Sequence, residues 1–540
     1  MHTMFNSYKG SRASKPQITP LSIKDWRGGL RVVGSDQTLQ SNYQVVAKNI
    51  YTNKDGKPVA RFGFEEKANL PTNPVEITYY QNFILAFLDD GTIYKIDSSF
   101  TQTAIWNTTI AAALPGAPTA WSATNHVDFT EFDGELVVCN GVDKPILIST
   151  SLSVTYLQDL ATGSNINTPI GKHVTTVDNY VVFANTSDDK TIHIASKGTS
   201  GTYVGDPAPN DGISLNLGKY VGSGNTEIVG VSNFNNKLIV FFDLVFLVVQ
   251  LGIYDGSVHV PDVVDVVQRA GMISHQSSYV ADTDIVFMSR SGVYTARQAT
   301  FSEQFEITPR SDNVSRDLLA NLAELKDEGE GSFMVVDELE QVMFFFVKDT
   351  SNVRHGYMMR YSADLKKISW SEVAGWDFSC GCSTLEKRVF FCEGTKLYQY
   401  GNDIFADENY YDDDGTNIEV DFELPWLDMG SRAQKKRIGR ILADTEGTAE
   451  VTIQIFRDKI YKDSLGNYDP AVEMDIKCGS SGGYGNPSTG YGGGRRADDE
   501  RHWGLPLECN LMKFRVFGSI NAKMLWTSVT FFVAKGNLQI

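Results

Sequence analysis

A short sequence pattern recurs seven times between Val75 and Asn402, and it constrains the fold more than any other feature. Each copy has an acid or amide turn, a run of Val, Ile, Leu and Phe, a polar turn that often holds Gly, and a short segment ending in Tyr or Ile. The clearest copy runs from Ile77 to Tyr94. The copies start at residues 77, 127, 173, 228, 277, 333 and 377, so successive starts lie 44 to 56 residues apart.

Periods of roughly 40–50 residues with strand-only content are typical of a β-propeller, in which each small sheet buries its faces against its neighbours. The apolar runs are of strand length and continuous, as expected for strands that are packed on both faces. The sequence therefore predicts an all-β chain with a propeller of six to eight blades, seven being favoured. The runs are Phe83–Leu88, Leu136–Cys139, Tyr180–Ala184, Leu238–Phe242, Ile285–Met288, Val342–Val347 and Val389–Cys392.

The regions outside the repeats predict a second β domain, a platform built from both ends of the chain. Ile50/Thr52 and Val59/Arg61 alternate about Asp55-Gly56 and indicate a hairpin before the first blade. Further strands are expected after residue 417. The predicted organisation is an extended arm (1–25), the platform hairpin (26–75), the propeller (76–402), an acidic linker (403–416) and a C-terminal β domain (417–540) with a flexible Gly-rich excursion (479–496).

Charge, cysteine content and the first residues limit the partners and the cellular compartment that we expect. The 540 residues carry a formal net charge of −18, so the surface should repel nucleic acid. Six cysteines make no disulfide framework, which predicts reduced thiols. The first ten residues lack the apolar core of a secretion signal, so Sec export is not expected.

The order of several short motifs resembles one group of viral proteins. A Gly28-Gly29-Leu30 entry, the strand Asn49–Tyr51, the Asp55-Gly56 turn and Arg61-Phe62-Gly63 precede the repeats. Gly271–Ser274 leads to Ile285–Tyr294, and Val314, Leu318, Leu319, Leu322 and Leu325 follow at helical spacing. This order is similar to that of the tail nozzle proteins of short-tailed bacteriophages, which include the tail tubular protein B and packaged-DNA stabilisation (tail hub) types.

The resemblance implies a structural virion protein rather than an enzyme. It implies a homohexamer in the virion tail, assembled in the host cytoplasm and attached to an adaptor ring below the portal, with a tail fibre, spike or needle as a further partner. Double-stranded DNA would pass through the ring without sequence-specific binding, because an acidic wall cannot hold phosphates by ion pairing. Loops 198–217 and 479–496 are candidates for gating. The alternative is a receptor-binding or glycan-cleaving propeller, which predicts an exposed cluster of aromatic and carboxylate side chains on one face.

Motifs that could carry chemistry have simpler interpretations. Ser481 lies in a Gly-x-Ser-x-Gly match, but no helix pattern follows it, and the Gly485–Gly490 loop continues with Tyr491 where a phosphate loop needs Lys. A calcium loop at 407–415 would need an acid at Tyr410. Cys380, Cys382 and Cys392 lack a second ligand pair for zinc and predict packed thiols.

Paired carboxylates and basic residues were the remaining candidates. Turn chemistry explains the blade-turn acids by itself, and the eight histidines form no pair at i, i+4. We therefore expect no catalytic, cofactor-binding or metal-binding residues and no cofactor. A basic corner could dock an acidic neighbouring subunit or be a solvated strand entry. The acids are Asp89, Asp133, Asp178, Asp243 and Asp282, and the basic corner is Arg432, Lys435, Lys436, Arg437 and Arg440.

Overall fold

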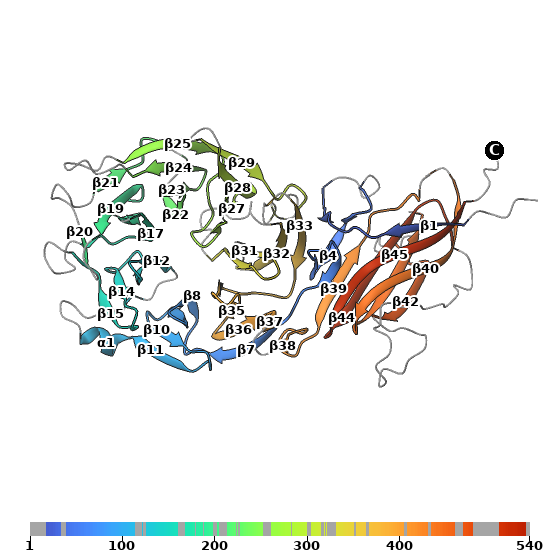
Figure 1. The fold of residues 1–540 in the computed structure, drawn as a ribbon, viewed down its shortest axis with the longest axis horizontal. Coiled ribbons are helices and arrows are strands. Elements are labelled where there is room, and N and C mark those ends of the chain that lie inside the picture. Colours follow the sequence, from blue (N-terminus) through green and yellow to red (C-terminus); the bar gives the residue numbers. More distant parts are fainter. Residues whose placement is uncertain are drawn as a thin grey trace, which may run out of the picture.

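The computed structural model describes most of the chain between residues 18 and 535. Figure 1 shows a ring of small sheets beside an elongated second β domain. The ranges not described are 1–17, 34–38, 114–120, 123–125, 160–167, 179, 187, 198–201, 205–212, 223, 225–226, 252–260, 282, 300–303, 315–317, 319, 321–330, 350, 352, 363–364, 366, 404–407, 430–431, 433, 459–467, 479–506 and 536–540.

The ring is a β-propeller of seven blades, each built on four antiparallel strands of which the first lies innermost (Figure 1). Blade 1 is β8 (Pro74–Tyr80), β9 (Phe83–Leu88), β10 (Ile93–Ile96) and β11 (Gln102–Trp106). Blade 2 is β12 (Asp128–Phe132), β13 (Glu135–Cys139), β14 (Ile146–Ile148) and β15 (Val154–Tyr156). The short helix α1 (Thr108–Ala112) joins these two blades.

Blade 3 is larger than the others. It is built from β17 (His173–Val177), β18 (Tyr180–Ala184), β19 (Thr191–Lys197) and β21 (Ile213–Asn216), with β20 (Thr202–Val204) and β16 (Gln158–Asp159) added at its edge. The expected loop 198–217 therefore contains two strands, β20 and β21, which both pair with β19. The prediction of a loop over that whole range was wrong.

The remaining blades follow in chain order. Blade 4 is β22 (Ile228–Phe234), β23 (Lys237–Phe242), β24 (Val245–Gln250) and β25 (Asp262–Gln268); blade 5 is β26 (Ser278–Val280), β27 (Ile285–Ser289), β28 (Gly292–Gln298) and β29 (Phe305–Pro309). Blade 6 is β30 (Phe333–Asp337), β31 (Val342–Lys348), β32 (Arg354–Tyr361) and β33 (Ile368–Val373). Blade 7 is β34 (Cys380–Ser383), β35 (Val389–Glu393), β36 (Lys396–Tyr400) and β7 (Phe64–Asn69).

Strand β7 closes the ring, because it precedes blade 1 in the chain yet forms the outer strand of blade 7. Residues 64–69 were assigned to the platform hairpin on sequence, so this boundary was wrong. The seven apolar runs lie within the second strands of the blades, in which nearly every residue is buried. Such strands are covered on both faces by the neighbouring blades, which explains why their sequences do not alternate.

The second domain, the platform, is a sandwich of two sheets. One sheet has the order β43 (Leu507–Cys509), β40 (Lys436–Gly447), β45 (Met524–Lys535), β6 (Pro58–Ala60), β5 (Ile50–Thr52), with β1 (Ile18–Ile23) also on β45. The other contains β4 (Val46–Lys48), β39 (Ile418–Glu423), β44 (Met512–Ile520), β41 (Glu450–Arg457) and β42 (Val472–Lys477). Strands from both ends of the chain therefore build this domain.

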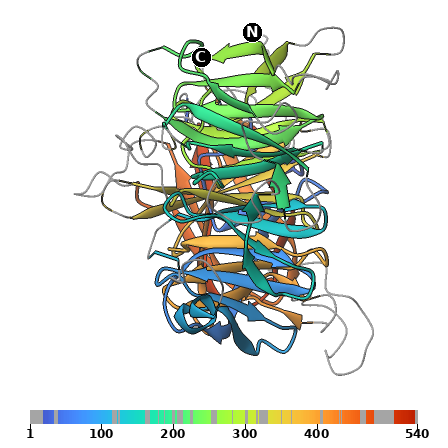
Figure 2. The ribbon, with the colours of Figure 1, turned by 90° about the vertical axis from the view of Figure 1, so that its left-hand side faces the viewer.

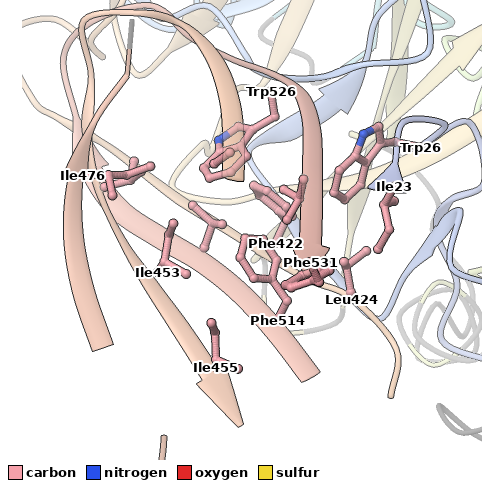
Figure 3. Close-up of a cluster of buried hydrophobic side chains, with 14 of the residues drawn as sticks. Ile23, Trp26, Phe422, Leu424, Ile453, Ile455, Ile476, Phe514, Trp526 and Phe531 are labelled. Atoms are coloured by element: carbon pink, nitrogen blue, oxygen red, sulfur yellow. The ribbon is translucent and has the colours of Figure 1, made fainter. Parts of the chain in front are cut away.

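Aromatic and aliphatic side chains fill the space between the two platform sheets (Figure 3). The Phe422 ring meets the rings of Trp26 and Trp526 edge-on at 5.8 and 5.6 Å between centroids, and Phe514 meets Phe531 at 5.8 Å. Along β41 the buried residues alternate with more exposed ones, as expected where one face of a sheet forms the core and the other faces solvent.

The two domains share one sheet. Strand β4 pairs with β39 of the platform and also with β33 of blade 6, so a nine-stranded sheet runs from the propeller into the platform. Small strand pairs lie near this junction: β2 (Gly29–Leu30) with β3 (Tyr43–Gln44), and β37 (Asn402–Asp403) with β38 (Glu408–Asn409). Figure 2, which views the molecule from the propeller end, shows the platform strands behind the ring.

Part of the expected acidic linker is packed structure rather than a solvated connection. The Gly63 amide donates to the Tyr410 carbonyl, and the Phe64 amide donates to the Asp412 carbonyl. The Asp414 amide in turn donates to the Phe64 carbonyl. A Cβ on Gly63 would lie 1.7 Å from the Asp412 oxygen, so only glycine permits this approach. Among the described residues, no helix has the length and apolarity needed to cross a membrane.

Candidate functional site

The innermost strands bring three histidines together that are far apart in the sequence. His126 precedes β12 of blade 2, His173 begins β17 of blade 3, and His275 lies just before β26 of blade 5. Their ring centroids are 4.2 Å (His126–His275), 5.0 Å (His126–His173) and 5.5 Å (His173–His275) apart. We call these three residues the histidine cluster.

Main-chain carbonyl groups fix the orientation of each ring. The Nε2 atoms of His126, His173 and His275 lie 2.6, 3.1 and 2.9 Å from main-chain carbonyl oxygens. A carbonyl oxygen only accepts, so each Nε2 carries a hydrogen, and in the neutral ring Nδ1 then carries the lone pair. The accepting oxygens belong to Lys172, Ile228 and Val127, respectively.

The surroundings of His126 favour its uncharged form. Burial, followed by repulsion from His275 and His173, holds the pKa of His126 well below its ordinary value. Asp128 provides a nearby negative charge, since its Oδ2 lies 3.5 Å from Nδ1 of His173. The Nδ1 atom of His173 is buried and has no hydrogen-bond partner within the described part of the chain.

Two further buried acids line the inner strands. Glu76 on β8 is buried, and burial raises the pKa of its carboxyl well above the usual range; the charges of Cys380 and Asp128 add to this. Asp337, at the end of β30, has its pKa raised to about 6, mainly by burial. Both groups take up protons more readily than exposed carboxyls, because a buried carboxylate loses its hydration.

A pocket of about 470 Å³ lies at the other ends of the inner strands. Its lining residues come from the ends of inner strands and the turns after them in blades 1, 2, 5, 6 and 7, so it occupies one mouth of the propeller channel. The Tyr279 hydroxyl donates to Glu338 at 3.2 Å, and Leu385 is 85% exposed. The lining residues are Tyr79, Tyr80, Gln81, Asn82, Glu131, Tyr279, Glu338, Ser383, Thr384 and Leu385.

The residues weighed on sequence do not form a site in the described structure. Asp133 and Asp178 have positive φ in tight turns, Asp89 bonds to Asn73, and Asp243 pairs with Arg290 at 2.5 Å. Cys380 and Cys392 face each other across β34 and β35, and all six cysteines are buried and free. Ser481, the Gly485–Gly490 loop, the excursion 479–496 and Asp282 lie outside the described residues.

The basic corner is largely engaged within the chain. Lys435 pairs with Glu508 at 2.8 Å, Arg432 lies 3.8 Å from Asp428, and Lys436 is buried with its Nζ 3.1 Å from the Asn510 carbonyl. Arg437 is exposed. Of the residues at helical spacing after Pro309, Val314 and Leu318 are buried, and the Leu318 amide donates to the Val314 carbonyl. Leu319, Leu322 and Leu325 lie outside the described residues.

The sequence does not reveal the histidine cluster within any single element, because no two of the eight histidines stand at i, i+4. A signal was present: His126, His173 and His275 fall within two residues of the starts of three repeats, at 127, 173 and 277. Equivalent positions at the start of the innermost strands converge on the axis of a propeller. Aligning the repeats by their first strands would therefore have placed all three residues near that axis.

Comparisons with known proteins assign no family to this chain. No protein-family model matches the sequence, and no curated protein matches it. A streptogramin B lyase structure is similar at 12% identity and a TM-score of 0.38, covering 63% of this chain and 98% of the lyase. PorZ, a surface component of the type-IX secretion system of Porphyromonas gingivalis, is similar at 12% identity and a TM-score of 0.37, covering 66% of this chain and 42% of PorZ.

Proposed function

We propose that this chain is a structural component of a short-tailed phage virion, forming the wall of the tail nozzle. Six copies would make a ring below the adaptor, retain the packaged DNA and conduct it during ejection, with a tail fibre, spike or needle as a further partner. In this role the protein is assembled in the host cytoplasm and performs no chemistry.

The observation that carries the proposal is the joint between the two domains. Two of the N-terminal motifs that resemble nozzle proteins contribute to it: Gly29 lies against blade 6, and Arg61 and Gly63 bind the segment after the propeller. A side chain at Gly29 would lie 2.7 Å from Ser369. A shared sheet and a close-packed joint suit a wall element that must hold its shape under the pressure of packaged DNA.

The propeller interior is a poor conduit for DNA, which favours a lumen between subunits. The rings of His126 and His275, from blades 2 and 5, approach to 4.2 Å between centroids across the inner strands. A duplex is far wider than such a gap. An assembled ring whose chains each carry a net charge of −18 would repel the phosphates and let DNA slide.

A second candidate function rests on the pocket at the channel mouth. Tyr79 and Tyr279 offer aromatic faces beside the carboxylates of Glu131 and Glu338, which is the type of cluster expected for a glycan-binding or glycan-cleaving propeller. The two functions are compatible, because a tail protein could also bind a surface polysaccharide. Cleavage would require both carboxylates.

Electron microscopy and mass measurement of the full chain test the first proposal. We expect six-fold rings, either alone or after addition of purified adaptor rings. The exposed Arg437 is a candidate for the subunit contact, so Arg437→Glu should weaken the ring, while Lys477→Glu, at a solvent-facing ion pair of β42, serves as the control. A persistent monomer that does not join adaptor rings, and that cleaves glycans in a Glu131→Gln-sensitive manner, would replace the nozzle by the second function.

A further inference from the structure

The histidine cluster has the composition and geometry of a metal site. One ligand nitrogen from each of His126, His173 and His275 can be chosen so that all three lie within 4.8 Å of one another. Three imidazole ligands around a zinc ion at 2.0–2.1 Å lie about 3.3 Å apart in tetrahedral geometry. Side-chain movements of about 1 Å would therefore complete the site.

We propose that His126, His173 and His275 bind a single divalent transition-metal ion of the zinc type, which ties blades 2, 3 and 5 together at the propeller axis. The proposal does not depend on the role in a phage tail. It concerns a structural ion, because the ligands come from three separate blades and span residues 126 to 275.

The hydrogen bonds to the carbonyl groups support metal binding over simple packing. A histidine that binds a metal through one nitrogen nearly always donates the other N–H to a carbonyl or carboxylate, which fixes the ring and its tautomer. All three rings meet this condition through Nε2. At His173 the second nitrogen is buried without a hydrogen-bond partner among the described residues, an arrangement that is costly unless a ligand binds there.

The donor set also indicates the class of ion. Imidazole nitrogen suits zinc, copper, nickel and cobalt, whereas calcium and magnesium prefer oxygen ligands. Asp128 lies beside the cluster, 3.5 Å from His173, and would balance part of the ion's charge as the fourth ligand or through a water molecule. The nearby Cys139 is a buried thiol whose Sγ donates to the Lys172 carbonyl at 3.5 Å, so it is engaged with the main chain.

Metal content and thermal stability of the full chain test the proposal. The protein is treated with a chelator, dialysed, and titrated with zinc or with cobalt, whose visible absorption reports tetrahedral binding. We expect one equivalent of zinc per chain, a thermal midpoint raised by several degrees, and cobalt bands in the visible region. An ion that binds only the native state stabilises it by mass action.

Matched variants separate this site from adventitious binding. His275→Gln keeps an N–H donor near the Val127 carbonyl but removes a ligand, and should abolish both the stoichiometric zinc and the midpoint shift. His355→Gln removes a half-exposed histidine paired with Asp349 and should leave both unchanged. Full zinc occupancy in His275→Gln, or wild-type protein that binds less than a tenth of an equivalent at micromolar zinc without a midpoint shift, would overturn the proposal. If His275→Gln does not fold, the zinc and cobalt titrations of the wild type decide alone.

Discussion

Arg61 is the residue on which the joint between the domains depends most. Its guanidinium is 1% exposed and binds Asp413 in a bidentate pair of 2.7 and 2.5 Å, while Nε donates to Asn49 at 3.0 Å. The Trp376 ring lies 4.2 Å from the guanidinium carbon, and its indole N–H reaches Asp413 at 3.3 Å. A planar, permanently charged group with a fork of donors fits this site, and lysine cannot replace it.

We expect Arg61→Ala to destabilise the chain by about 3–5 kcal/mol, because it leaves the Asp413 carboxylate unpaired in a mostly buried position. Arg61→Lys should lose much of the same free energy, since one ammonium cannot make the bidentate contacts. Urea unfolding of the two variants measures the loss.

Arg432→Ala is the control for Arg61→Ala, because the Arg432 side chain is 52% exposed and lies 3.8 Å from Asp428. Exposed pairs contribute about 0–1 kcal/mol. Equal losses in Arg61→Ala and Arg432→Ala would contradict the importance of the buried pair.

Asp337 gives the stability a specific dependence on pH. Burial raises the pKa of its carboxyl to about 6 in the folded protein, so between the ordinary carboxyl pKa and 6 the folded state binds more protons than the unfolded state. The contribution of this group to the free energy of unfolding is therefore largest below the ordinary carboxyl pKa, and it is lost as the pH rises through 6. Asp337→Asn should remove that loss.

The stability that Asp337→Asn gains over wild type should therefore be larger at pH 7.5 than at pH 4 by about 2 kcal/mol, from 1.36 kcal/mol per pKa unit over the pH range up to the pKa of about 6. Denaturant unfolding at both pH values tests it. The amide oxygen still accepts from Leu339 and Glu340, whose amides bond to Asp337 at 2.9 and 3.1 Å. A gain that is the same at both pH values would show that Asp337 is not the titrating group.

At the scale of elements, the sequence predicted the strands better than their partners. All seven apolar runs lie within the second strands of the blades, and the Ile50–Ala60 hairpin pairs about Asp55-Gly56 as expected. Continuous apolar runs and turn residues are local signals, so strands can be recognised from them without knowledge of the fold. Ring closure by β7 has no such signal, because its partner β36 lies more than 300 residues away.

The histidine cluster illustrates the same limit at the candidate site. Which blades face each other depends on the blade count and on the closure, and the sequence left the count open between six and eight. Residues of blades 2 and 5 therefore could not be brought together from spacing alone. Local turn chemistry does fit Asp133 and Asp178, which both have positive φ.

Closure by β7 predicts where the propeller opens first when it is weakened. Phe64 on β7 packs against Tyr398, Phe378 and Trp376 at 4.8, 5.1 and 5.8 Å between centroids. We expect Phe64→Ala to cost about 3–5 kcal/mol, as a large buried aromatic does. Hydrogen exchange should increase first in blades 7 and 1, which the closing strand holds together.

Phe531→Ala is the matched variant in the platform core, where the ring is fully buried against Phe514. Its effect on hydrogen exchange should begin in β40, β44 and β45. Exchange that increases uniformly in both variants would contradict a local role of the closing strand.

At the scale of the whole molecule, the joint makes the propeller and the platform one mechanical unit. Strand β4 lies between blade 6 and the platform, and Asn49, directly after it, donates to the Glu419 carbonyl at 2.7 Å while accepting from the Ala374 amide at 2.9 Å. Hydrophobic clusters of the propeller include Leu30, Ala47 and Tyr51 from the N-terminal segment. The cores of the two domains are therefore connected through the same short stretch of chain.

This continuity predicts a single cooperative unfolding transition for the monomeric chain, although its 540 residues form two domains. Domains joined by a flexible linker unfold separately, whereas domains that share strands and buried polar contacts lose stability together. Differential scanning calorimetry should show one peak in the wild type. The double variant Arg61→Ala/Asn49→Ala removes the polar contacts of the joint but keeps β4. In this variant the single calorimetric peak should separate into two. Two peaks in the wild type would show that the joint is a hinge, and a hinged subunit would be a poor wall for a tube that contains DNA under pressure.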